Sequence, residues 1–228
     1  MGEYLALLVG YNNRDMSFEE YLGHWAQLHG TQAPQGLVRI WLRIAFVLST
    51  PFTRLNPNSI TGFGLVLMLT AIYFAGSKNG SYFLASGLVL LVGIVDSLDG
   101  IVAVRTSKIS SWGAFLDSVV DRFIDVGIGI LLIILGAPVE LAVIAFAIAF
   151  IHEYMRAKAS GIGMREVGVI TPAEKPTRIA IGVKFLLACG VFPERAAQLA
   201  NIAVLVWVTL GVLSFAILMR SFRKTLKS

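Results

Sequence analysis

The sequence predicts an all-α integral membrane protein with six transmembrane helices and an N-terminal amphipathic helix at the membrane interface. The 228 residues are 56% hydrophobic and only 14% charged, and the mean hydropathy is +0.75, whereas soluble domains carry about 25% charged residues. Several apolar stretches approach the ~20 residues that cross a bilayer. The net charge of +5 suits an anionic membrane surface, and no nucleic-acid-binding pattern is present.

Residues 1–34 are predicted to form a cytoplasmic segment that contains one short helix. Ser17 and Glu20 have the spacing of a capping box and stand before an apolar face that includes Tyr21 and Leu22. The segment lacks the basic and apolar sequence of a secretory leader. We therefore expect no cleaved signal peptide.

Residues 35–54 are predicted to form an amphipathic helix in the membrane interface. Apolar residues recur there at helical spacing, with Arg39 and Arg43 on the opposite face. A short helix that packs on the protein core would show the same periodicity and stays an alternative. The apolar positions are Leu37, Val38, Trp41, Ile44, Ala45 and Leu48.

Residues 55–219 are predicted to form a six-helix membrane domain, and residues 220–228 a basic cytoplasmic tail. Some of the apolar stretches are shorter than a bilayer is thick and adjoin polar residues, so their helices are expected to extend beyond the hydrocarbon. The six stretches are Ile60 to Ala75, Tyr82 to Val95, Trp112 to Leu135, Val139 to Phe150, Ile179 to Val191 and Ala197 to Met219.

The distribution of Lys and Arg predicts the orientation of these helices. Basic residues in short loops stay on the cytoplasmic side, and the loops of one side carry only Lys78 and Arg195. Both termini are therefore expected in the cytoplasm of a multi-pass cell-membrane protein, together with any active site formed at the helix ends beside the basic loops. The basic residues assigned to the cytoplasmic side are Arg14, Arg39, Arg43, Arg54, Arg105, Lys108, Arg156, Lys158, Arg165, Lys175, Arg178, Arg220, Arg223, Lys224 and Lys227.

Five of the six aspartates fall within one thirty-residue window of the second and third predicted spans. A carboxylate at the centre of a membrane helix costs about 2.5–3.5 kcal/mol, so these side chains are not expected to face lipid. The alternative to a functional cluster is that these aspartates are scattered over the helix ends, where water and nearby basic groups neutralise them. The five are Asp96, Asp99, Asp117, Asp121 and Asp125.

The spacing of four of them predicts a metal site. Asp96 and Asp99 share one helix face, as do Asp117 and Asp121, and two antiparallel helices could bring the four carboxylates together. An all-oxygen site favours Mg²⁺ or Mn²⁺, or Ca²⁺, over zinc. Asp125 is expected to bond Arg122 or a neighbouring helix rather than metal. A divalent-cation carrier would also use such carboxylates.

The same segment resembles the signature of the CDP-alcohol phosphotransferase (CDP-alcohol phosphatidyltransferase) family. The resemblance covers about Leu55 to Met219 and implies a homodimer. The matching residues read Asp96-Ser-Leu-Asp99-Gly100-Ile-Val-Ala103 and then Gly113-Ala-Phe-Leu-Asp117-Ser-Val-Val-Asp121.

The resemblance implies roles for these residues. Asp96, Asp99 and Asp117 would hold two divalent cations, and Asp121 would both hold metal and act as the general base. Small residues would let a nucleotide approach the backbone, although tight helix packing explains them equally well. Asn58 and Thr61 also form a turn and helix start, for which capping is a sufficient reason. The predicted nucleotide-binding residues are Asn58, Thr61, Gly100, Ala103, Arg105 and Gly113.

One position departs from the family signature. The family has Arg directly after Ala, whereas this chain reads Ala103-Val104-Arg105. A step of one residue turns a side chain by about 100° around a helix. Lys108 or Arg122 are candidates to replace the displaced arginine.

A basic segment between the fourth and fifth spans predicts that the acceptor alcohol carries a phosphate. Its Lys and Arg could bind a phosphate, although the ordinary excess of positive charge on the cytoplasmic side explains part of the pattern. The segment resembles the phosphatidylinositol-phosphate synthases of the family. The predicted acceptor-binding residues are Arg156, Lys158, Lys175 and Arg178.

The sequence thus predicts metal-dependent transfer of a phosphatidyl, or related lipid phosphoryl, group from a CDP-linked lipid to an alcohol, with release of CMP. Inositol phosphate is the expected acceptor, and glycerol phosphate or another alcohol is the alternative. A cation carrier and an inactive membrane scaffold are the hypotheses from other classes.

Overall fold

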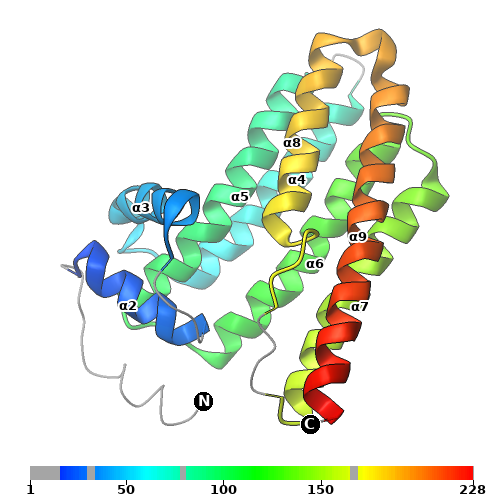
Figure 1. The fold of residues 1–228 in the computed structure, drawn as a ribbon. Coiled ribbons are helices and arrows are strands. Elements are labelled where there is room, and N and C mark those ends of the chain that lie inside the picture. Colours follow the sequence, from blue (N-terminus) through cyan, green and yellow to red (C-terminus); the bar gives the residue numbers. More distant parts are fainter. Residues whose placement is uncertain (1–15, 30–33, 78–80, 165–168, 228) are drawn as a thin grey trace. The chain divides into compact units, whose positions relative to one another are not determined.

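The structure is a computed structural model that describes residues 16–29, 34–77, 81–164 and 169–227. The regular elements in these ranges are helices (Figure 1), which confirms the all-α class. Arg14, Lys78 and Arg165, used above to predict orientation, lie outside the described residues. The elements are α2 (Phe18–His29), α3 (Gly36–Ser49), η1 (Thr50–Phe52), α4 (Pro57–Gly76), α5 (Tyr82–Arg105), α6 (Ser111–Ile134), α7 (Val139–Gly161), α8 (Lys175–Val191), η2 (Pro193–Arg195) and α9 (Ala196–Lys227).

Six long helices, α4 to α9, match the six predicted apolar stretches, and only Leu135 of the third stretch lies outside its helix. As expected, α5, α7 and α8 extend beyond the apolar stretches at their polar ends. Among the described residues, three helices are long and apolar enough to cross a membrane by length and composition: Pro57–Gly76, Tyr82–Arg105 and Pro193–Leu226.

The chain divides into two compact units. The first consists of Met1–Val66 and Val92–Asp121, and the second of Leu67–Leu91 and Arg122–Ser228. Helices α4, α5 and α6 each contribute residues to both units. We describe each unit by itself.

In the first unit, α2 is fixed to α3 by aromatic and charged contacts. The predicted capping box is confirmed, because the Ser17 backbone N–H donates to Glu20 Oε2 at 2.7 Å and the Glu20 backbone N–H donates to Ser17 Oγ at 3.3 Å. The Tyr21 ring lies 5.4 Å from the Phe46 ring, and Arg39 pairs with Glu19 at 2.5 Å. These contacts join an N-terminal helix to the core of the unit.

In the second unit, small residues allow close helix packing, as is common where helices meet in membranes. A Cβ added to Gly127 would lie 2.5 Å from Cγ of Met68, and one added to Gly211 would lie 2.9 Å from Cγ2 of Ile148. Helix α9 packs along α7 and α8 (Figure 1). The helix spacing here leaves no room for larger side chains.

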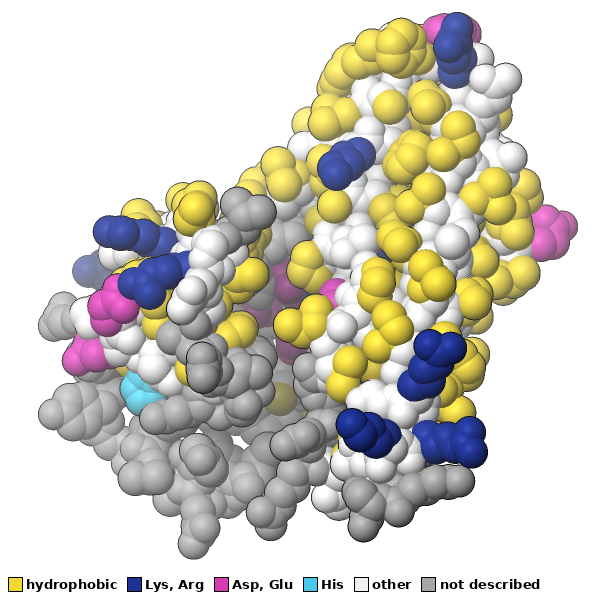
Figure 2. Space-filling model, in the orientation of Figure 1, with side chains coloured by type: hydrophobic (Ala, Val, Ile, Leu, Met, Phe, Trp, Pro, Cys, Tyr) yellow, Lys and Arg dark blue, Asp and Glu magenta, His cyan; other side chains and the backbone are white. Residues whose placement is uncertain are grey.

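The outer surface of α8 and α9 is largely apolar. Figure 2 shows hydrophobic side chains along both helices and basic side chains near the C-terminal end of α9. The exposed apolar residues include Leu187, Leu205 and Val212, and the exposed basic residues include Arg220 and Arg223. An apolar band with a basic end is the surface expected of a helix that lies in lipid and ends at a cytoplasmic leaflet.

Candidate active site

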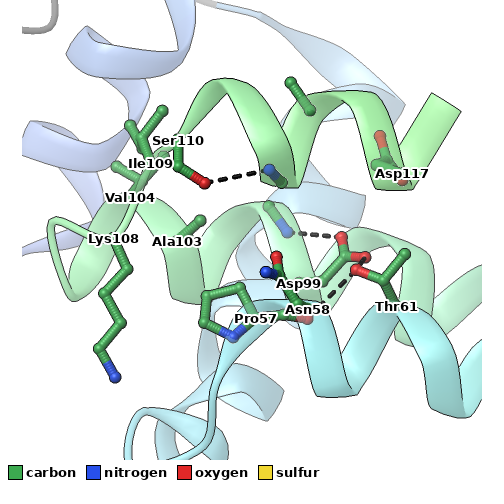
Figure 3. A pocket seen from close by; sticks show the side chains of 13 residues that line it. Pro57, Asn58, Thr61, Asp99, Ala103, Val104, Lys108, Ile109, Ser110 and Asp117 are labelled. Carbon is green, nitrogen blue, oxygen red and sulfur yellow. Dashed lines mark hydrogen bonds between the residues drawn. The ribbon is translucent and has the colours of Figure 1, made fainter.

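A pocket of about 370 Å³ lies in the first unit, between the start of α4, the end of α5 and the start of α6 (Figure 3). Its size falls within the range of small-ligand sites. Its surface combines two carboxylates with small residues and one lysine. The lining residues are Pro57, Asn58, Thr61, Asp99, Gly100, Ala103, Val104, Lys108, Ile109, Ser110, Gly113, Ala114 and Asp117.

Asp99 is held in a fixed orientation at this pocket. The Thr61 hydroxyl donates to Asp99 Oδ2 at 2.6 Å, and the Gly100 backbone N–H donates to Asp99 Oδ1 at 2.6 Å (Figure 3). Only 6% of Asp99 is exposed. The structure thus gives Thr61 the role of orienting a carboxylate, in addition to its place in the pocket lining.

Three of the four predicted metal-binding aspartates come together in the same unit. One carboxylate oxygen from each of Asp96, Asp117 and Asp121 lies within 4.8 Å of the others, and all three residues are half-buried. Three clustered carboxylates fit Mg²⁺ or Mn²⁺, since hard cations prefer oxygen ligands. Asp99 is outside this group but shares the pocket with Asp117, so Asp117 connects the pocket to the cluster.

The two glycines of the pocket differ in their surroundings. A Cβ on Gly100 would meet no atom within 4 Å, whereas one on Gly113 would lie 3.1 Å from Ser110 Oγ and 3.2 Å from Asn58 Oδ1. Helix packing therefore does not explain Gly100, and open pocket space does. Gly113 serves close packing, which brings Asn58 to the pocket wall.

Arg105 points away from this pocket, although it was predicted to bind nucleotide. Only 5% of it is exposed, and its Nη1 donates to Phe46 O at 3.2 Å and to Ser49 Oγ at 2.9 Å. Its guanidinium lies 4.4 Å from the centre of the Phe46 ring. The one-residue displacement thus directs the arginine to α3, and Val104 lines the pocket instead.

Lys108, predicted as a candidate to replace the displaced arginine, lines the pocket. Ser110 also lines it and was absent from the predicted nucleotide-binding set. The Gly113 backbone N–H donates to Ser110 Oγ at 3.0 Å, so Ser110 caps the start of α6. A Ser ahead of a helical stretch is a recognisable cap signal, and it could have been found from the sequence.

Two of the predicted acceptor-binding residues hold carboxylates in the second unit. Arg156 forms a two-pronged pair with Glu174, at 2.5 and 3.1 Å, and Arg178 donates from Nε to Asp125 Oδ1 at 2.6 Å. Lys158 is exposed and Lys175 is half-buried. The sequence showed the positive charges of this segment but not their partners.

Asp125 behaves as predicted. Besides the bond from Arg178, its Oδ2 lies 3.1 Å from Arg122 Nη1, and 1% of the residue is exposed. It therefore belongs to an ion-paired network rather than to the aspartate cluster of the first unit. Because Arg122 pairs with Asp125, it is also a poor replacement for the displaced arginine.

The sequence model of the CDP-alcohol phosphatidyltransferase family matches residues 54–219. The chain belongs to the CDP-alcohol phosphatidyltransferase family. This match begins one residue before the predicted limit at Leu55 and ends at the predicted limit, Met219. It confirms the resemblance that the aspartate and glycine spacing indicated and the assignment of the chain to an enzyme family of transferases.

Curated relatives in the CDP-alcohol phosphatidyltransferase family include synthases of inositol lipids. An archaetidylinositol phosphate synthase of Pyrococcus horikoshii is 31% identical over 160 residues, which are 68% of this chain and 79% of that protein. A phosphatidylinositol phosphate synthase of Cutibacterium acnes is 27% identical over 202 residues, which are 82% of this chain and 96% of that protein.

A solved structure shares the fold. The phosphatidylinositol phosphate synthase PgsA1 of Mycobacterium tuberculosis, with CDP-DAG bound, superimposes with a TM-score of 0.58 over 77% of this chain and 94% of that chain. The two sequences are 22% identical. The similarity supports a CDP-alcohol phosphatidyltransferase fold for this chain.

Proposed function

We propose that this protein transfers a phosphatidyl group from a CDP-linked lipid to a phosphorylated polyol such as inositol phosphate, and that it releases CMP. The observation that carries the proposal is the pocket next to the clustered carboxylates of Asp96, Asp117 and Asp121. Family membership supports the CDP-linked donor. The names of the relatives from Pyrococcus horikoshii and Cutibacterium acnes support inositol phosphate as the acceptor.

The proposed chemistry follows from the carboxylates. Asp96, Asp99, Asp117 and Asp121 would hold two divalent cations, which would neutralise charge on the diphosphate as its bond breaks. Asp121 accepts the proton of the acceptor hydroxyl. The hydroxyl oxygen then forms a bond to the phosphorus next to the lipid, while the bond from that phosphorus to the oxygen of CMP breaks.

We call the pocket of about 370 Å³ in the first unit the nucleotide pocket. The open space at Gly100 and the small side chain of Ala103 admit the donor there. Asn58, Thr61 and Gly113 complete its wall. Because Thr61 fixes Asp99 through a 2.6 Å bond, it prepares that carboxylate for its role before the donor arrives.

For the acceptor, the proposal keeps Lys158, Lys175 and Arg178 and changes the role of Arg156. The Arg156 guanidinium donates to both carboxylate oxygens of Glu174. We therefore assign Arg156 to holding the segment that precedes α8. Arg178 has its Nη2 buried without a hydrogen-bond partner among the described residues, which supports a contact with an anionic acceptor.

We also propose the membrane arrangement that the sequence predicted: six spans, both termini in the cytoplasm, and a homodimer. For α3, the support is a row of exposed apolar side chains. Val38, Ile40, Ile44 and Val47 are each at least half exposed, and such a surface suits the membrane interface.

The experiment that tests the proposed function measures CMP release by the purified chain. CDP-diacylglycerol and an ether-linked CDP-lipid are offered with inositol phosphate, glycerol phosphate, inositol or serine, with Mg²⁺ or Mn²⁺. We expect release with inositol phosphate and none after EDTA treatment. Metal transport into sealed vesicles without CDP-lipid, and no CMP release with any acceptor, would instead support the carrier.

The Asp121→Asn variant tests the general base. Since general bases contribute about 10²–10⁴-fold to rate, kcat should fall at least about 100-fold. The matched control is Glu140→Gln, an exposed acid on α7 that should retain wild-type turnover. If Asp121→Asn turned over at the wild-type rate, Asp121 would not be the base.

A further inference from the structure

The charges of the nucleotide pocket are unevenly distributed. Among the described residues that line it, Lys108 is the one basic residue, while Asp99 and Asp117 are acidic. A nucleoside diphosphate lipid carries negative charge on both phosphates. The carboxylate end of the pocket can receive that charge only through cations, whereas Lys108 can receive it directly.

The backbone holds Lys108 in a defined position at the end of α5. The Lys108 N–H donates to Ala103 O at 2.9 Å, and the Ser107 N–H donates to Val104 O at 3.2 Å. Ser107 has a φ of 52°. These two bonds around a left-handed residue form a Schellman motif, which turns the chain and presents the lysine beside Ala103 at the pocket.

The Lys108 side chain is available for a ligand. Figure 3 shows it extended from the turn after α5, on the side of the pocket where Pro57 lies. No ion pair or side-chain hydrogen bond joins it to the residues that the structure describes. A lysine that lines a pocket without a protein partner is suited to bind an anion there.

The neighbouring basic residue cannot serve this purpose. Arg105 is buried against Phe46 and donates to Ser49 and Thr50. It does not line the pocket. To reach the pocket it would have to give up these bonds.

We propose that Lys108 binds the diphosphate of the CDP-linked donor, and that Arg105 holds the end of α5 against residues 46–50. This inference rests on the proposed function and specifies which side chain of this chain recognises the donor. In this proposal Lys108 contacts the ligand, and Arg105 fixes the helix that carries it.

The test compares CDP with cytidine as inhibitors of donor turnover in the full chain and in Lys108→Met, at fixed Mg²⁺. Loss of one charge-assisted contact should raise the KM for the CDP-lipid and the inhibition constant of CDP about 10- to 100-fold. Cytidine has no phosphate, so its inhibition constant should not change. Lys108→Arg should restore most of the CDP affinity, since it keeps the charge.

Lys184→Met is the matched control, because Lys184 is exposed on α8 and lies outside the pocket lining. It should behave as wild type. If Lys108→Met does not fold, as judged by its thermal midpoint, Lys108→Gln takes its place with the same expectations.

Three outcomes would overturn the inference. The first is wild-type CDP inhibition in Lys108→Met, the second is an equal weakening of CDP and cytidine, and the third is a change confined to the KM of the acceptor. Failure of the proposed function is a separate result: the wild-type chain would then release no CMP from any donor. In that case CDP and cytidine binding to the two chains is compared by calorimetry, and wild-type CDP affinity in Lys108→Met overturns the inference.

Discussion

Among the described residues, each of the two units contains one almost fully buried arginine, and the contacts of the two arginines differ. The contacts of Arg105 in the first unit include a carbonyl, hydroxyls and the face of the Phe46 ring. Arg178 of the second unit is held by a carboxylate, with Nε 2.6 Å from Asp125 Oδ1, and by Ala173 O at 2.6 Å from Nη1.

The difference determines what remains when one partner is lost. When Arg105 is removed, the carbonyl of Phe46 and the hydroxyl of Ser49 keep a bond between themselves, since Ser49 Oγ already donates to Phe46 O at 2.7 Å. Removal of Asp125 instead leaves the charge of Arg178 buried. Two equally buried arginines should therefore differ in their contribution to stability.

The largest effect is expected for Asp125→Leu. It leaves the Arg178 guanidinium buried without its counter-ion, which costs about 3–5 kcal/mol. Thermal and denaturant unfolding of the solubilised chain measures this loss. The double variant Asp125→Leu with Arg178→Met removes both charges and should recover much of the stability. No recovery in the double variant would show that packing, rather than charge, sets the cost.

An intermediate effect is expected for Arg105→Met. The variant keeps apolar contact with Phe46 and loses the hydrogen bonds to Phe46 O and Ser49 Oγ, so the free energy of unfolding should fall by about 1–2 kcal/mol. The same unfolding measurement applies. Arg105→Lys should not fully restore stability, because lysine lacks the planar group that stacks on a ring. A loss as large as that of Asp125→Leu would contradict the comparison.

The smallest effect is expected at Glu174, which pairs with the less deeply buried Arg156. Burial alone would raise the pKa of Glu174, but hydrogen bonds from Arg156 and Thr171 outweigh it and hold the pKa below its ordinary value of 4.5. The stabilisation is thus present above pH 4.5 and is lost as pH falls through the folded-state pKa.

Melting curves between neutral pH and about pH 3 measure this loss, which should be about 1 kcal/mol or less for a partly exposed pair. Glu174→Gln cannot ionise, so it should be less stable at neutral pH and less sensitive to acid. Identical acid sensitivity in Glu174→Gln and wild type would assign the low-pH loss to other carboxylates.

Much of the fold could be predicted because apolar stretches and caps are local signals. The six long helices follow from runs of apolar residues, and the Ser17–Glu20 capping box follows from a spacing of three. The aspartate cluster could also be predicted from the sequence, because carboxylates in membrane helices are too costly to face lipid. Arg122 was predicted as a partner of Asp125, and the two residues lie three positions apart in α6.

The partners of Arg105, Arg156 and Arg178 could not be predicted, because they come from distant positions in the sequence. Arg178 pairs with an aspartate 53 residues away, and Arg156 with a glutamate 18 residues away. Helical spacing shows that Arg105 points in a different direction from the arginine of the family signature. It does not show that Arg105 contacts Phe46 and Ser49. Such pairings depend on which helices pack together, which no local pattern encodes.

The surroundings of Arg105 bear on where the domain begins. Similarity to the family starts at residue 54, but the groups that bury and bond Arg105 belong to residues 46–50. A chain cut at the limit of similarity would expose a guanidinium in the middle of the signature segment. Residues that contact Arg105 thus lie outside the region of family similarity, and we expect a stable fragment of this protein to need α3 as well.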